Sequence, residues 1–125
     1  MIQKDKELLL KDLLGRLPYG VKVLYEEEIY QIFEISIFNE TITIWGEKGY
    51  PIEVEIQKVK PYLLPGSSMN LSQRIEYSKT LVIFNESHCS QTHETYDWLD
   101  KNNYDYRGLI EKGLAIDATN LNIYK

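Results

Sequence analysis

The amino-acid sequence is poor in cysteine, histidine and proline, and it contains no long run of apolar residues. Cys89 is the only cysteine among the 125 residues, so no disulfide bond can form within the chain. No segment approaches the roughly 20 apolar residues that cross a bilayer, and residues 1–6 lack the apolar stretch of a signal peptide. These absences predict a soluble, cytoplasmic protein with no membrane partner.

The motifs of the common enzyme classes are also missing. The chain has no glycine-rich phosphate loop, no dinucleotide fingerprint, no paired-cysteine zinc motif and no histidine–glutamate metalloprotease motif. No two carboxylates stand out as the catalytic pair of a hydrolase, because residues 26–28 resemble a solvated turn and Glu53 and Glu55 fall on the outer side of a predicted strand. We therefore expect a protein that is not an enzyme and needs no cofactor.

Acidic residues outnumber basic ones, 19 against 14, which gives a net charge of −5. Both halves of the chain share this excess, so neither forms a strongly basic domain. Binding to a nucleic-acid backbone draws much of its affinity from clustered lysine and arginine. The charge thus disfavours nucleic acid as the main partner, although a local basic patch in the folded chain would still permit it.

Leucines recur at helical spacing near the N-terminus. The spacing i, i+3, i+4 and i+7 predicts a helix over residues 5–17, which ends at Pro18 because proline disfavours helical backbone in the residue before it. Leu10, Leu13, Leu14 and Leu17 form its predicted apolar face, and Lys11, Asp12 and Arg16 lie on its polar side.

Between residues 21 and 64 the apolar period changes to two, which indicates short β-strands joined by tight turns. Turns are predicted at residues 26–28, 39–40 and 46–49, and the alternation slips near residues 58–60, indicating a bulge or one 3₁₀ turn. The pattern predicts an SH3-like antiparallel β-barrel over about residues 20–64, or a meander packed on the first helix. The longest strand has Ile29, Gln31, Phe33, Ile35 and Ile37 on one predicted face.

Helices and loops are predicted for residues 65–125. Asn70 and Gln73 are spaced as a capping box for a helix over residues 71–79, and Thr92 is a predicted N-cap for a helix over residues 93–102. A short apolar strand is expected at residues 81–84, a polar loop at 85–91, a turn or helix around 109–112 and an extended segment at 114–116. The whole chain is predicted to be one α+β domain.

One polar segment gathers side chains that bind metals. His88, Cys89 and His93 lie within six residues, and zinc takes imidazole, thiolate and carboxylate ligands, usually four of them. No second cysteine or further histidine exists to complete the shell, so Asp or Glu would have to do so. A polar loop leading into a capped helix is the simpler interpretation. A small metal-dependent enzyme stays the alternative.

Ten tyrosines are the most unusual feature of the composition. Tyrosine buries a large ring while its hydroxyl needs a polar partner or water, which suits sheet faces and interfaces. Tyr25, Tyr30, Trp45 and Tyr50 are predicted to form an aromatic binding platform on the barrel. Core packing and cross-strand ring pairs are the competing interpretation of the same residues.

The C-terminal part holds a second group of candidate binding residues. Trp98, Tyr106 and Arg107 belong to the residue types that dominate binding hot spots. Alternatively, Arg107 holds the tail in place by donating to Asp105, to Asp117 or to a helix C-terminus. We favour this structural role over a recognition surface.

Five strings occur in order along the chain: LPYGV at 17–21, VKPYL at 59–63, SSM at 67–69, DWL at 97–99 and DYRGLIEKGLA at 105–115. Taken together, they resemble a family of small uncharacterised proteins of gut anaerobes, often found in prophages and mobile elements. The resemblance covers most of the chain from Leu13 to Ala118 and implies a genomic setting but no catalytic residues.

These observations lead to a hypothesis about function. We expect a phage- or mobile-element-associated accessory protein that acts by protein–protein interaction, with another protein or a second copy as partner. Nucleic-acid binding through the aromatic face of the barrel is the alternative from another class, and the metal-dependent enzyme is the third.

Overall fold

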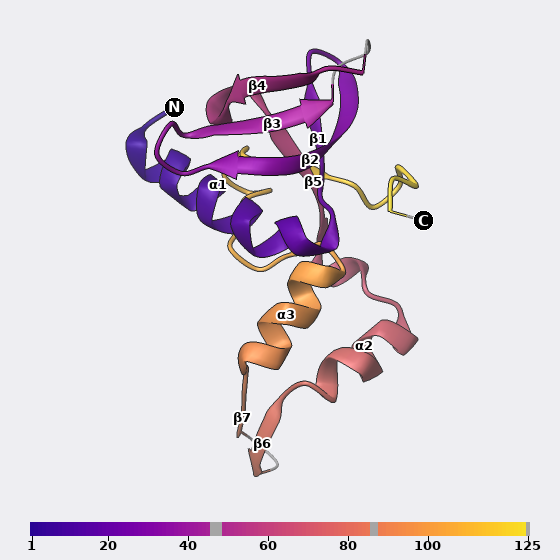
Figure 1. Cartoon of the computed structure of the whole chain (residues 1–125). Helices are drawn as coiled ribbons and strands as arrows, with labels where there is room; N and C mark the ends of the chain where they lie inside the picture. The colour runs from indigo at the N-terminus through magenta and orange to yellow at the C-terminus, as the bar shows by residue number, and fades with distance from the viewer. Residues whose placement is uncertain (46–48, 86–87, 125) are drawn as a thin grey trace.

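The computed structural model describes residues 1–45, 49–85 and 88–124, without the side chains of residues 83–89. The turn predicted at residues 46–49 therefore lies almost entirely outside the described residues. The chain has the predicted α+β organisation: a helix comes first, a mainly antiparallel sheet follows, and further helices come later. Figure 1 shows the sheet at one end of the molecule and the later helices at the other.

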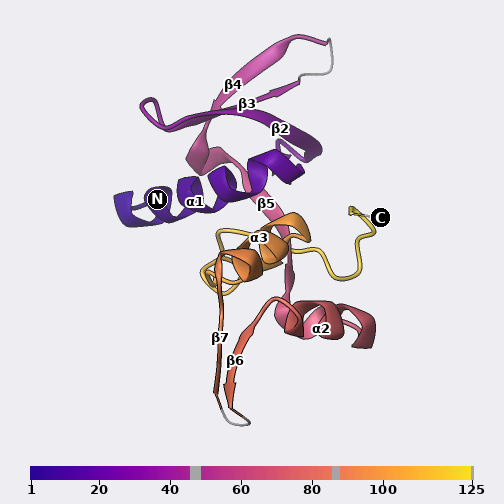
Figure 2. The same ribbon diagram turned by 60° about the horizontal axis from the view of Figure 1, so that its bottom comes forward.

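The N-terminal helix α1 (Gln3–Arg16) ends in the 3₁₀ turn η1 (Leu17–Tyr19), which contains Pro18. This confirms the predicted helix to within two residues at its start. The predicted division of its faces is partly wrong, because Asp12 and Arg16 are fully buried while Leu14 is 37% exposed. Figures 1 and 2 give the reason: α1 lies between the sheet and α3 (His93–Lys101), so it is covered on two sides.

Seven of the described strands form an open sheet in the order β4-β3-β2-β1-β5-β8, and β9 also pairs with β5. The prediction of a barrel is therefore wrong, and an antiparallel meander of β1 to β4 is present instead. β5 returns antiparallel to β1, and its later residues pair with β8 and β9 in parallel, so this edge does not meet β4. The strands are β1 (Lys22–Tyr25), β2 (Glu28–Ser36), β3 (Thr41–Trp45), β4 (Pro51–Glu55), β5 (Lys60–Pro65), β8 (Tyr104–Asp105) and β9 (Ile116–Asp117).

The turns between the strands explain several features of the sequence. The acidic run forms the tip of the β1–β2 hairpin, where Glu26 and Glu27 have φ of 47° and 66°. Two consecutive residues with positive φ are typical of the tight turn that fits the twist of a hairpin. The slip predicted near residues 58–60 is a 3₁₀ turn, η2 (Ile56–Lys58), which leads into β5.

A regular strand pattern is interrupted in β2. The register against β3 shifts between Ile32 and Glu34, so Phe33 is the extra residue of a bulge. Ile32 is buried in the core and Ile35 packs against it, whereas Phe33 is 41% exposed. The prediction that Phe33 shares a face with Ile35 is therefore wrong.

The core lies between the inner face of the sheet and α1, and Leu109, Leu114 and Ala115 of the C-terminal segment pack into it. Its members are Leu9, Leu10, Leu13, Val21, Val23, Ile32, Ile42, Ile44, Val54, Ile56, Val59, Leu63, Leu109, Leu114 and Ala115.

The second part of the molecule follows β5 and the 3₁₀ turn η3 (Gly66–Ser68). Both predicted N-caps are confirmed: Asn70 and Gln73 form a capping box for α2 (Leu71–Ser78), and Thr92 with Thr95 forms one for α3. The predicted loop at residues 85–91 instead contains a strand, β7 (His88–Ser90), which pairs with β6 (Val82–Asn85). Figures 1 and 2 show this hairpin pointing away from the sheet.

Candidate functional site

Among the described residues, two surfaces bring together side chains suited to binding. The first is the outer face of strands β2, β3 and β4. Phe33 and Trp45 stack there with their ring centroids 5.0 Å apart and an angle of 19° between the planes. Trp45 is 53% exposed, although the preceding residue, Ile44, is fully buried. Because successive strand residues point to opposite faces, the stacked pair lies on the side of the sheet that α1 leaves uncovered.

Acidic side chains lie beside this aromatic pair. Glu34 and Glu53 are both paired with Thr43, and Thr43 shares the face of Trp45 two residues further along β3. The three strands contain four glutamates and no lysine or arginine. We call Phe33, Glu34, Trp45 and Glu53 the outer aromatic face.

The four rings predicted to form one platform are not all on this face. Tyr25 and Tyr30 contact each other, with centroids 6.3 Å apart, and pack against the core on the inner side of the sheet. Trp45 lies on the opposite side with Phe33, a partner that the sequence pattern did not indicate. Tyr50, just before β4, is 70% exposed.

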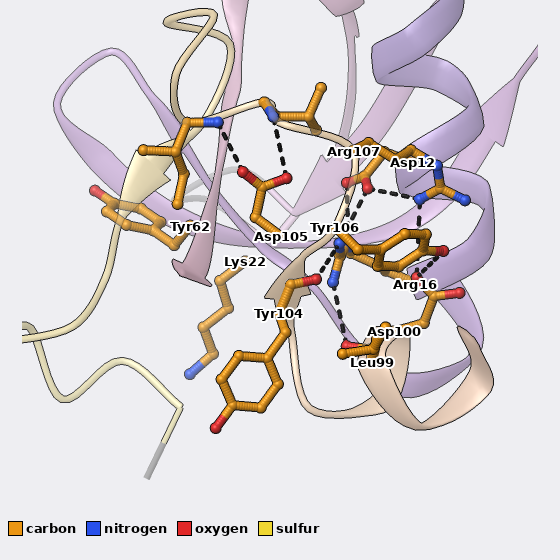
Figure 3. A network of polar contacts seen from close by, with 12 residues as sticks. Asp12, Arg16, Lys22, Tyr62, Leu99, Asp100, Tyr104, Asp105, Tyr106 and Arg107 are labelled. Carbon is orange, nitrogen blue, oxygen red and sulfur yellow. Dashed lines mark hydrogen bonds and ion pairs between the residues drawn. The ribbon is translucent and has the colours of Figure 1, made fainter. Parts of the chain in front are cut away.

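The second surface surrounds a buried ionic network between α1 and the C-terminal part, shown in Figure 3. Arg16 donates from Nε to Asp12 Oδ2 at 2.9 Å and from Nη2 to Asp12 Oδ1 at 3.0 Å. Its Nη2 also donates to the Tyr104 carbonyl at 2.7 Å, and Nη1 reaches the Leu99 carbonyl at 3.5 Å. Both side chains are fully buried, so these contacts replace the water that either charge would otherwise need.

Arg107 adds a second guanidinium to the same carboxylate. Its Nη1 donates to Asp12 Oδ1 at 2.7 Å and lies 3.9 Å from Asp100 Oδ1. The Tyr106 hydroxyl donates to Asp100 at 2.9 Å, and the Arg107 guanidinium carbon lies 4.4 Å from the centre of the Tyr106 ring. The tail is thus held, as expected, by Arg107, but its partner is Asp12 of α1 instead of Asp105 or Asp117.

Asp105 and Gly15 help to position the residues of this network. Asp105 acts on the turn that follows Arg107, and Gly15 acts on the contact between α1 and α3. Asp105 accepts from the backbone N–H groups of Leu109 and Ile110, both at 3.0 Å, which closes the turn after Arg107. Gly15 in α1 lies so close to Asp100 that an added Cβ would meet its Oδ2 at 2.9 Å. The absence of a side chain at this position therefore allows α1 and α3 to approach each other.

Burial changes the acid–base properties of the network. It raises the pKa of the Asp100 carboxyl above its ordinary value, against the lowering effect of the Tyr106 hydrogen bond and of both arginines. Burial, followed by the hydrogen bond to Asp100, raises the pKa of Tyr106 to about 12. Tyr106 therefore keeps its proton and acts as a hydrogen-bond donor near neutral pH.

An open hollow of about 630 Å³ lies over this network. We call it the polar hollow. It is lined by Lys11 of α1, by Gln91, by His93, Tyr96 and Asp100 of the α3 region, and by Tyr106 and Arg107.

Of the other predicted binding residues, Trp98 has a packing role. Its ring stacks on Tyr104 at 5.5 Å with an angle of 7° and contacts Tyr77 of α2 at 5.8 Å. Tyr104 is almost completely buried. Trp98 thus joins α2, α3 and β8.

The side chains of His88 and Cys89, two of the three predicted metal ligands, lie outside the described residues. His93 is described and lines the polar hollow. Among the side chains that the structure describes, no group of three or more histidine, cysteine or acidic residues is arranged to hold a metal ion.

The residues that sequence reasoning missed are Asp12 and Arg16, which form the centre of the network. Their i, i+4 spacing is the signal that could have indicated a pair on one helix face. The spacing alone says nothing about burial, because most such pairs lie on solvated surfaces.

None of the helices in the described ranges has the length and apolar character that crossing a membrane requires. Comparison of the chain with family models, with curated proteins and with solved structures finds no match.

Proposed function

We propose that this chain is an accessory protein of a phage or mobile element and that it binds a partner protein through the outer aromatic face. The observation that carries the proposed binding is the stacked pair of Phe33 and Trp45, half exposed on strands that bear glutamates and no basic residue. Aromatic rings at such positions are typical of interaction hot spots. We also propose that the meander together with β5 forms the SH3-like unit expected from the sequence.

The charge of the face indicates the chemistry of the partner. Glu34 and Glu53 flank the rings, so a segment that contributes arginine or lysine can pair with the carboxylates and place its cation over the Trp45 ring. A second copy of the chain would present the same acidic face, and like charges would oppose face-to-face pairing. A nucleic-acid backbone would be repelled in the same way.

The free edge of the sheet is a less suitable docking site than its face. β4 is the terminal strand, but it begins with Pro51 and carries Glu53 and Glu55. Proline and charged residues are the features that discourage the addition of another strand to a sheet edge. We therefore assign binding to side chains on the face.

Fluorescence polarisation with a labelled peptide that alternates arginine and valine tests the proposal. We expect salt-sensitive binding that Trp45→Ala and Glu53→Lys each weaken by about tenfold, because one removes the stacking ring and the other reverses a flanking charge. Glu111→Lys, which makes the same charge change at an exposed site outside the sheet, is the matched control and should leave the affinity within about twofold.

Three results would contradict this function. One is equal binding of a peptide in which glutamate replaces every arginine. Another is a loss of affinity in Glu111→Lys as large as that in Glu53→Lys. The third is salt-sensitive binding of single- or double-stranded oligonucleotides that is tighter than binding of the cationic peptide, which would favour the nucleic-acid alternative.

A further inference from the structure

The polar hollow is built from three segments that are far apart in the sequence. α1 contributes Lys11, α3 contributes His93, Tyr96 and Asp100, and the segment after β8 contributes Tyr106 and Arg107. Its volume of about 630 Å³ falls in the range of small-molecule sites, roughly 300–1,000 Å³. The outer aromatic face lies on the other side of the sheet from α1, so the hollow is a separate surface.

The charges around the hollow do not cancel. Arg16 and Arg107 are balanced by Asp12 and Asp100 within the network. Lys11 is exposed at the rim and has no ion-pair partner within 4 Å among the described residues, so it adds one positive charge to the lining of the hollow. A locally positive hollow in a chain of net charge −5 favours an anionic ligand.

Arg107 is positioned to bind such a ligand directly. Among the described residues its protein partners all contact Nη1, which leaves Nε and Nη2 of a side chain that is still 17% exposed. The Tyr106 ring lies 4.4 Å from the guanidinium carbon and supports the plane of the group. A guanidinium held in this way presents parallel N–H donors that match the oxygens of a phosphate or carboxylate.

Aromatic surface lies beside these donors. Tyr96 is 40% exposed and contacts Tyr106, with their ring centroids 5.2 Å apart. Its free surface offers an apolar wall to the part of a ligand that is not charged. A cationic fork next to a ring is suited to a small molecule that combines an oxyanion with a carbon skeleton.

The geometry points to the polar hollow as a binding site for a small-molecule oxyanion, a phosphate or carboxylate, held by Arg107 and Lys11 with Tyr96 packing on the remainder of the ligand. Asp100 and Tyr106 keep Arg107 in place and do not bind the anion. This site does not depend on the outer aromatic face, so either proposal can fail without the other.

Titration of the ¹⁵N-labelled full chain with inorganic phosphate and, separately, with benzoate tests this site. We expect saturable changes in the ¹H–¹⁵N signals of His93, Tyr96 and Arg107 with at least one anion. Binding to both assigns a general oxyanion site, and binding to only one assigns that anion class. Lys11→Glu should weaken binding by about tenfold, because it reverses the unpaired charge at the rim.

Lys4→Glu is the matched control, since it makes the same charge change on the exposed start of α1 and does not line the hollow. It should leave the affinity within about twofold. Arg107→Lys keeps a cation beside Asp12 but removes the planar fork, so it should also weaken binding. The proposal is overturned if neither anion gives saturable changes, or if Lys4→Glu and Lys11→Glu weaken binding equally.

Discussion

Asp12 accepts hydrogen bonds from two arginines that come from distant parts of the chain. Arg16 lies one turn further along α1, whereas Arg107 is in the C-terminal segment. A carboxylate in the interior is tolerated only when such partners compensate for the lost water. Asp12 therefore joins the N-terminal helix to the C-terminal segment and also fixes the arginine that borders the polar hollow.

Replacing Asp12 should destabilise the protein strongly. Asp12→Ala leaves Arg16 buried without its carboxylate, and removing one partner of a buried ion pair typically costs about 3–5 kcal/mol. Urea unfolding followed by circular dichroism measures the change. Asp5→Ala, on the same helix but outside the network, should change the free energy of unfolding by less than about 1 kcal/mol. Equal effects of the two substitutions would contradict a structural role for Asp12.

For single residues, the sequence indicates the chemistry of a side chain but not whether it is accessible. Trp45, Tyr106 and Arg107 were identified as candidates by residue type, and each lies on one of the two proposed binding surfaces. Tyr25 and Tyr30 share the chemistry of Trp45 but point to the inner face. Residue type indicates what a side chain can bind, whereas its accessibility depends on which face of the sheet the helix covers.

At the scale of elements, local signals were the most successful. The capping residues Asn70 and Thr92 were predicted at the positions where α2 and α3 begin, because an N-cap acts through backbone groups two or three residues away. The bulge at Phe33 was missed. A bulge depends on the pairing of two strands, and the alternation within one strand does not reveal it.

Thr92 makes a prediction at this scale. Its Oγ1 caps Thr95 N–H and also contacts the Thr80 carbonyl at 3.1 Å, linking the start of α3 to the end of α2. Thr92→Ala should lower the free energy of unfolding by about 1 kcal/mol, and Thr92→Ser, which keeps the hydroxyl, by much less. Urea unfolding measures both. A Ser variant as unstable as the Ala variant would mean that the methyl group, and not the cap, matters.

At the scale of the whole molecule, the C-terminal segment connects two neighbouring strands of the sheet, β1 and β5. The Tyr124 hydroxyl donates to the Tyr62 carbonyl of β5 at 2.6 Å and accepts from the Lys22 backbone N–H of β1 at 3.0 Å. Lys22 Nζ donates in turn to the Ile123 carbonyl at 3.0 Å. The last residues therefore hold β1 and β5 side by side.

This arrangement makes stability sensitive to alkaline pH. Burial raises the pKa of Tyr124 to about 12, whereas an unfolded tyrosine titrates near pH 10. Between these values the unfolded chain loses this proton while the folded chain keeps it, so the free energy of unfolding falls as pH rises. Tyr106, also raised to about 12, contributes in the same direction.

Urea midpoints measured from pH 8 to pH 11 test this sensitivity. The midpoint should fall above about pH 10, and the fall should be smaller in Tyr124→Phe, which has no phenol to ionise. Tyr19→Phe, at an exposed position in η1, should keep the wild-type slope. An unchanged slope in Tyr124→Phe would show that ionisation of this hydroxyl is not coupled to unfolding.

The amino-acid sequence by itself determined the class of the fold, the N-terminal helix, the presence of short strands joined by tight turns, and both capped helices, because those features depend on periodicity and on contacts within a few residues. Tertiary structure alone decided that the sheet stays open and that Asp12 and Arg16 are buried. It also decided that Phe33 joins Trp45 on the uncovered face. These outcomes depend on contacts between segments that are far apart in the sequence. Such contacts decide which side of α1 and of the sheet is buried, and they form only when the whole chain packs.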